Sequence, residues 1–133
     1  MRQTSVTRLY DDNRTRLQLT HVSGRLDATL SVSEERIWPA DLVGHLNLIH
    51  PSRLQILGAA ELAWARRQSR DKVAHHLNEI LASHPPAIII ADGCDVPPIL
   101  HEVCAAHDVA LFSTPHPAAS VIDQLRLYLS RQL

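Results

Sequence analysis

The chain has 133 residues, of which 45% are hydrophobic and 4% are aromatic. This length suits one ordinary domain, so we expect residues 1–133 to fold as a single unit around a core of aliphatic side chains. Because 13 basic and 14 acidic residues leave a formal net charge of −1, the composition argues against nucleic acid and anionic membranes as partners.

We expect neither a membrane span nor a secretory signal in this sequence. It has no apolar run close to the ~20 residues that a membrane span requires, and residues 1–10 lack the apolar core of a secretory signal. Its two cysteines, Cys94 and Cys104, are too few for a secreted fold that depends on disulfides. We therefore expect a cytoplasmic protein with reduced thiols.

The first third of the chain predicts short elements. Thr4 or Ser5 can cap a short N-terminal helix. Segment 17–22 begins with strand-like alternation, 28–32 is a second weak strand, and the Ser-Gly pair at 23–24 between them is typical of a turn. We expect these two strands to pair as a hairpin.

The middle of the chain predicts one strand and three helices. Apolar residues recur at helical spacing in 40–49, which predicts a helix. Residues 54–57 form a compact strand that ends at Gly58, and the good helix formers of 59–68 follow. Ser69 can start a further helix with one apolar face. That face consists of Val73, Leu77, Ile80 and Leu81.

Residues 85–114 predict a strand, a crossover helix and a second strand. The mostly β-branched run 87–91 is typical of a strand that is covered on both faces. Pro97 and Pro98 suit the first turn of a helix, and 109–113 restores a strand that can lie parallel to the first. A terminal helix follows. Its apolar face consists of Val121, Ile122, Leu125, Tyr128 and Leu129.

Together these elements predict a three-layer α/β domain with a small, mainly parallel sheet and βαβ crossovers. Its strands would be 54–57, 87–91 and 109–113. In such sheets, ligands bind beyond the carboxyl ends of the strands. The residues expected there, which we name the candidate ligand edge, are Gly58, Asp92, Gly93, Asp95 and His116.

Standard phosphate-binding motifs are absent from the sequence. A Walker loop needs a Gly-rich turn followed by Lys and Ser or Thr, but Lys72, the only lysine, falls within a predicted helix. Asp92 follows a strand, as the phosphoacceptor of a response-regulator receiver does. That reaction also needs an acidic pair after a strand to hold Mg²⁺ and a later Lys to neutralise the phosphoryl group, and the sequence has neither. We interpret Asp92 as a turn residue that bonds its own backbone before Gly93.

Nine histidines raise the question of a metal site. The adjacent His75 and His76 would point about 100° apart on a helix. His101 and His107 lack the i, i+4 spacing of zinc-binding helices, so no metal site is predicted. Cys104 falls on a buried helix face and is expected to be a core residue.

The order of the elements resembles a known family. Residues 51–58 read PSRLQILG and Glu61 follows, which closely resembles the RIQVLG..E passage in the N-terminal domain of bacterial HPr serine kinase/phosphorylase. The resemblance continues through 86–90, Pro97-Pro98, 109–114 and 125–133. Segment 38–49 departs from the family's usual Asn-Arg-Pro-Gly-Leu passage.

The resemblance implies what the parent protein does. Such proteins use ATP or pyrophosphate with magnesium to phosphorylate a serine of the carrier protein HPr, and they reverse the reaction by phosphorolysis. They control carbon metabolism or the sugar phosphotransferase system, and the resemblance implies that they assemble as hexamers. Their phosphate loop, catalytic carboxylate and HPr contacts belong to a C-terminal domain outside this sequence. The resemblance therefore assigns no catalytic, cofactor or metal residue to this chain.

Two interpretations of the function stay open. The preferred one is a noncatalytic regulatory or assembly domain that has no cofactor and associates with itself, because the edges of the weak strands in 17–32 would be exposed. The alternative is a module that binds a uridine nucleotide or a sugar phosphate at the candidate ligand edge. We consider uridine nucleotides because the family's N-terminal domain resembles the uridine-nucleotide-binding domain of muramyl-peptide ligases.

Overall fold

The computed structural model describes residues 2–32, 38–46 and 52–133. The elements are β1 (Arg2–Ser5), α1 (Val6–Asn13), β2 (Thr20–Ser23), β3 (Thr29–Val32), the 3₁₀ turn η1 (Pro39–Leu42), β4 (Val43–His45), β5 (Leu54–Leu57), α2 (Ala59–Arg66), α3 (Arg70–Ala82), β6 (Ala87–Ile90), α4 (Pro98–His107), β7 (Ala110–Ser113) and α5 (Ala118–Gln132). Within these ranges, no helix is both long and apolar enough to cross a membrane.

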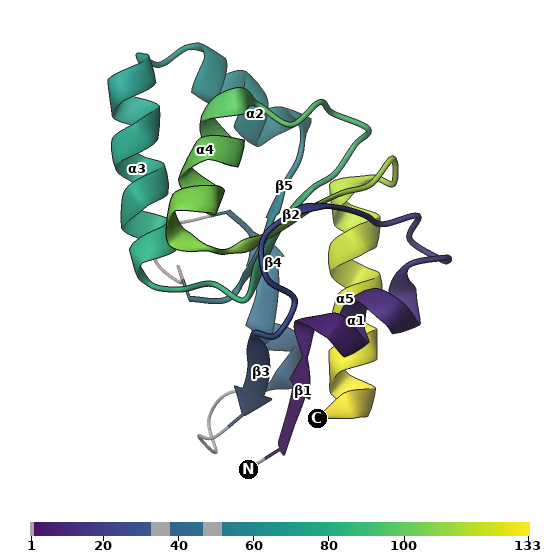
Figure 1. The fold of residues 1–133 in the computed structure, drawn as a ribbon. Coiled ribbons are helices and arrows are strands. Elements are labelled where there is room, and N and C mark those ends of the chain that lie inside the picture. The colour runs from purple at the N-terminus through teal and green to yellow at the C-terminus, as the bar shows by residue number, and fades with distance from the viewer. Residues whose placement is uncertain (1, 33–37, 47–51) are drawn as a thin grey trace.

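The predicted α/β fold with a mainly parallel sheet is confirmed. Among the described residues the main sheet has the strand order β2-β7-β6-β5-β4, and its β4-β5, β5-β6 and β6-β7 pairings are all parallel. Strand β2 lies antiparallel to β7 at one edge, and β1 and β3 form a separate two-stranded antiparallel sheet. Helices α2, α3 and α4 cover one face of the main sheet, while α1 and α5 cover the other (Figure 1). The molecule thus has three layers.

The central strand β6 supplies side chains to both cores. Ile88 and Ile90 point to the core under α2, α3 and α4, whereas Ile89 points to the core under α1 and α5. All three side chains are fully buried. A strand that is covered on both faces has to be apolar throughout, which explains the continuous run that marks this strand in the sequence.

Several helix boundaries follow from local capping, as the sequence predicts. The hydroxyl of Ser5 accepts a hydrogen bond from the backbone N–H of Arg8 at 3.1 Å, which starts α1. The hydroxyl of Ser69 does the same for Lys72 at 3.2 Å and starts α3. These contacts satisfy backbone amides that have no partner within the helix.

The predicted hairpin between 17–22 and 28–32 is wrong. Residues 20–23 form β2, which pairs with β7, and residues 29–32 form β3, which pairs with β1. In β2, the ring of His21 packs against Phe112 of β7 with 5.4 Å between ring centroids. Pairing with β7 gives β2 a partner within the five-stranded sheet, which a two-stranded hairpin cannot do.

The predicted helix over 40–49 is also wrong where the structure describes it. A 3₁₀ turn at 39–42 leads into β4, an edge strand that lies parallel to β5, and 47–49 lie outside the described residues. Four apolar residues in the sequence of this segment, Leu42, Val43, Leu46 and Ile49, match helical spacing, but Gly44 is a poor helix former. The sheet gains a fifth strand from this segment.

One contact between α1 and α5 leads to a pH prediction. The hydroxyl of Tyr128 donates a hydrogen bond to Oδ2 of Asp12 at 2.6 Å. Burial raises the pKa of Tyr128 to about 12, and the adjacent Asp12 carboxylate adds to the rise. The unfolded chain titrates near pH 10, so the neutral phenol stabilises the fold below that pH, and this stabilisation is lost as the pH rises from about 10 to 12.

We therefore expect the free energy of unfolding of the wild type to fall more steeply over this pH range than that of Tyr128→Phe. Urea melts at stepped pH values measure both slopes. Parallel pH profiles for the two proteins would contradict the raised pKa of Tyr128.

Candidate functional site

The carboxyl ends of β5, β6 and β7 meet the N-termini of two helices. Gly58 follows β5 and is the N-cap residue of α2. Asp92 and Gly93 follow β6, and His116 lies shortly before α5. The fold therefore brings four residues of the candidate ligand edge together, while Asp95 lies exposed in the loop that leads to α4.

The carboxylate of Asp92 caps both helices at this edge. Its Oδ2 accepts a hydrogen bond from the backbone N–H of Ala59, the first residue of α2, at 2.7 Å. Its Oδ1 accepts one from the N–H of Ala118, the first residue of α5, at 2.9 Å. A negative charge between two helix N-termini is favourable because the free amides and the helix dipoles make these ends positive.

Backbone contacts hold Asp92 in place. Asp92 and Gly93 both adopt left-handed conformations, with φ of 60° and 67°. The N–H of Asp92 donates to the carbonyl of His116 at 2.8 Å, and that of Gly93 donates to the carbonyl of Thr114 at 3.1 Å. The buried hydroxyl of Thr114 donates to the carbonyl of Leu17 at 2.5 Å, which ties this edge to the loop before β2.

Gly58 has no side chain, and the carboxylate of Asp92 occupies the space where one would lie. A Cβ atom at Gly58 would lie 2.3 Å from Oδ2 of Asp92 and 3.0 Å from Cβ of Ala118. The amide of Gly58 is itself bonded to Oε1 of Glu61 at 2.8 Å. The absence of a side chain at Gly58 is therefore required by the approach of Asp92.

These contacts revise the interpretation of Asp92 as a residue that bonds its own turn. Its side chain instead joins residues that are 33 and 26 positions away in the sequence. The amides that would hold a phosphate at this edge already have an anionic partner within the chain, and a ligand would have to displace it. No local pattern reveals this role, because the partners meet only through the sheet topology.

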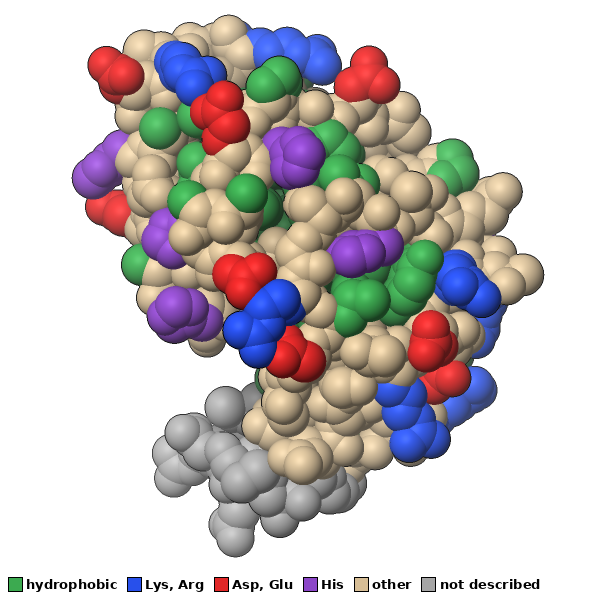
Figure 2. Space-filling model, in the orientation of Figure 1, with side chains coloured by type: hydrophobic (Ala, Val, Ile, Leu, Met, Phe, Trp, Pro, Cys, Tyr) green, Lys and Arg blue, Asp and Glu red, His purple; other side chains and the backbone are tan. Residues whose placement is uncertain are grey.

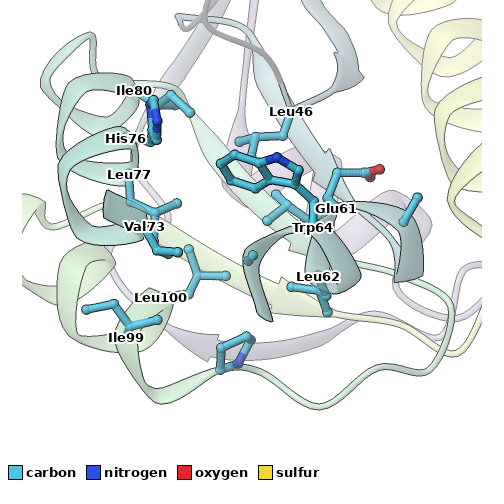
Figure 3. Close-up of a pocket in the computed structure, with 14 residues that line it drawn as sticks. Leu46, Glu61, Leu62, Trp64, Val73, His76, Leu77, Ile80, Ile99 and Leu100 are labelled. Atoms are coloured by element: carbon cyan, nitrogen blue, oxygen red, sulfur yellow. The ribbon is translucent and has the colours of Figure 1, made fainter. Parts of the chain in front are cut away.

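An apolar pocket of about 520 Å³ lies between α2, α3 and α4 (Figure 3). Sequence reasoning did not identify it, because its walls come from three helices that are separated along the chain. Its lining residues include Leu46, Leu57, Leu62, Trp64, Val73, His76, Leu77, Ile80, Ile99 and Leu100.

Few polar atoms face this pocket. The Trp64 side chain projects over it and is 41% exposed, and its ring meets the edge of the His76 ring with 5.8 Å between centroids. Glu61 also lines it, but Oε1 of Glu61 is bonded to the amide of Gly58. The pocket therefore suits an apolar surface better than a phosphate group.

His75 and His107 each contact a polar side chain, and the histidines form no metal centre within the described ranges. His75 contacts Glu79 at 2.8 Å, and His107 contacts Asn78 at 2.9 Å. No group of three or more His, Cys, Asp or Glu residues in that part of the chain could hold a metal ion. Acidic and basic side chains are interspersed on the face shown in Figure 2.

Cys104 is a core residue, as predicted. Its side chain is fully buried, and burial raises the pKa of its thiol to about 12. The thiolate that nucleophilic chemistry requires is therefore unfavourable at this position. Cys94 is half-buried in the loop between β6 and α4.

Comparisons with known proteins identify the family. Residues 4–129 match the family described as HPr Serine kinase N terminus. The HPr kinase/phosphorylases of Azoarcus sp. and Aromatoleum aromaticum are 80% and 71% identical to this chain over all 133 residues. That of Bordetella pertussis is 44% identical over 129 residues.

The chain spans 42% of the length of each of these relatives. Among solved structures, the CBS and DRTGG domains of the regulatory region of a Clostridium perfringens pyrophosphatase align over 98% of this chain and 73% of their own, with 12% identity and a TM-score of 0.35. The match over residues 4–129 shows the family: the chain belongs to the HPr serine kinase N-terminal family.

Proposed function

We propose that this chain is the noncatalytic regulatory and assembly domain of a cytoplasmic HPr kinase/phosphorylase. The observation that carries the proposal is the match of residues 4–129 to the N-terminal family. The chain also spans only 42% of the length of its kinase relative from Azoarcus sp.. The parent protein would phosphorylate and dephosphorylate a serine of HPr with ATP or pyrophosphate and magnesium, and it would thereby control carbon metabolism or the sugar phosphotransferase system.

The geometry of the candidate ligand edge supports a noncatalytic role. Phosphoryl transfer needs cations and free amide donors that are positioned around the phosphates. At this edge the amides of Ala59 and Ala118 bond to Asp92, and the only lysine, Lys72, lies in α3. A uridine nucleotide or sugar phosphate at the same edge has less support for the same reason.

An assembly role is supported by the small sheet of β1 and β3. Among the described residues these strands pair only with each other, so each has an outer edge that no other strand covers. Such edges favour pairing with another chain. The small sheet and the C-terminal end of α5 lie at the same end of the molecule (Figure 1). We propose that self-association occurs at this end, with a dimer as its simplest closed form.

The test compares three proteins: this chain, the full-length Azoarcus sp. relative, and that relative without the residues that match this chain. Each is incubated with labelled ATP, magnesium and HPr, and its mass is measured by light scattering. We expect no label on HPr with this chain alone. We expect the shortened relative to keep phosphoryl transfer but to form smaller assemblies than the full-length protein.

Two results would contradict the proposal. Label on HPr in the presence of this chain alone would show a phosphate site within it. An unchanged mass of the shortened relative, together with a strictly monomeric chain over a wide concentration range, would remove the assembly role.

A further inference from the structure

A second pocket, of about 280 Å³, lies between the edge strand β4 and helix α5. It shares no residue with the candidate ligand edge, so the capping by Asp92 does not fill it. Its charged lining comes from two arginines and one carboxylate. The residues that matter for the argument are Gly44, Arg53, Ile122, Asp123 and Arg126.

Arg53 enters this pocket across the backbone of β4. A Cβ atom at Gly44 would lie 2.5 Å from both Cζ and Nη2 of Arg53, so the guanidinium occupies the space that a side chain at Gly44 would take. Nη2 donates a long hydrogen bond of 3.3 Å to the carbonyl of His45. The Nε–H of Arg53 is buried and has no acceptor among the described residues. Because this N–H is shielded from solvent, an anion in the pocket would accept from the Nη groups of Arg53 instead.

Arg126 brings a second positive charge to the same pocket. Burial lowers the pKa of Arg53, the nearby Arg126 lowers it further, and Asp41 acts in the opposite direction. Within the part of the chain that the structure describes, neither arginine forms an ion pair with a carboxylate. The fold thus holds two guanidinium groups in one pocket, and the Asp123 carboxylate that lines it with them forms no ion pair with either among the described residues.

We propose that Arg53 and Arg126 bind a small phosphoryl anion in the pocket between β4 and α5. Guanidinium groups present forked N–H donors that match phosphate oxygens, and two of them match a dianion. The pocket is smaller than the typical site for a drug-sized ligand or a nucleotide. The ligand is therefore inorganic phosphate or the phosphate group of a small metabolite.

Asp123 sets the strength of this site. Its carboxylate lines the same pocket and repels an anion, so it offsets one of the two arginine charges, and Asp41, which acts electrostatically on Arg53, offsets part of the other. We expect weak binding, in the millimolar range that suits an abundant ion. Removing the Asp123 charge should therefore strengthen binding.

The experiment follows the side-chain Nε–Hε resonances of the two arginines in the ¹⁵N-labelled chain during titration with inorganic phosphate. Sodium chloride at the same ionic strength is the control, and glycerol 3-phosphate is the second ligand. We expect a saturable shift of the Arg53 resonance with phosphate and none with chloride. Arg126→Gln, which changes an exposed side chain, should weaken binding about tenfold, and Asp123→Asn should strengthen it severalfold.

The second ligand distinguishes the two sources of the anion. Binding of glycerol 3-phosphate at least as tight as that of phosphate supports a site for a phosphorylated metabolite, whereas a response to phosphate alone supports a site for the free ion. A shift of equal size in chloride, or phosphate binding that is the same in Arg126→Gln and in the wild type, would overturn the proposal.

Discussion

Replacing Ile89 with alanine is expected to lower the free energy of unfolding by about 2–5 kcal/mol. Ile89 lies in the middle strand of the main sheet, where its backbone pairs with Ile56 on one side and Phe112 on the other. Its side chain is fully buried in the core under α1 and α5. Because the paired strands cannot close around a smaller side chain, most of the lost volume would remain as a cavity.

Leu127→Ala is the matched control for this substitution. Leu127 lies on α5, which covers the same core, but its side chain is 50% exposed. Its truncation should change stability by less than about 0.5 kcal/mol. Urea melts of the three proteins give both differences. A loss below ~1 kcal/mol for Ile89→Ala would contradict the burial of this strand.

The sequence predicts the fold well from residue 54 onward. Strands β5, β6 and β7 are mostly apolar and have 4 residues each, and the helices between them start at local signals such as Ser69 and Pro98. These signals act within a few residues, so they can be read without knowing the rest of the fold. Both parallel pairings of β6 then follow from the need for helical crossovers.

The first third of the chain could not be predicted in the same way. Strand β2 has 4 residues like β5, β6 and β7, but it is polar in part and no more than half-buried, and β4 has only 3 residues; each is fixed by its partner strand. Strand β2 pairs with β7, which lies about 90 residues later, as the His21↔Phe112 register shows. Such short segments have too little periodicity to separate helix from strand, and tertiary pairing decides their structure.

The candidate ligand edge shows the same limit at the level of single residues. The rule for the carboxyl ends of strands correctly places Gly58, Asp92 and His116 near one another, because it depends only on strand direction. The partners of the Asp92 carboxylate depend instead on how α2 and α5 begin beside the same strand end. Residue type and spacing carry no information about that geometry.

The role of Asp92 as a shared cap leads to the last prediction. Asp92→Ala removes the acceptor of the Ala59 amide and that of the Ala118 amide at once. Loss of one N-cap side chain costs about 0.5–2 kcal/mol, so we expect a loss of about 1–4 kcal/mol when both helices lose theirs. Asp92→Asn keeps one carbonyl oxygen but turns an NH₂ group toward the second amide, so its loss of stability should be intermediate.

Asp95→Ala is the control, because Asp95 is an exposed carboxylate in the same loop. Its replacement should change stability by less than about 0.5 kcal/mol. Hydrogen exchange adds a local measurement: in Asp92→Ala, the amides of both Ala59 and Ala118 should exchange faster than in Asp95→Ala, since both lose an acceptor. If only one amide exchanged faster, or if the two alanine variants were equally stable, Asp92 would not be holding two helices through one carboxylate.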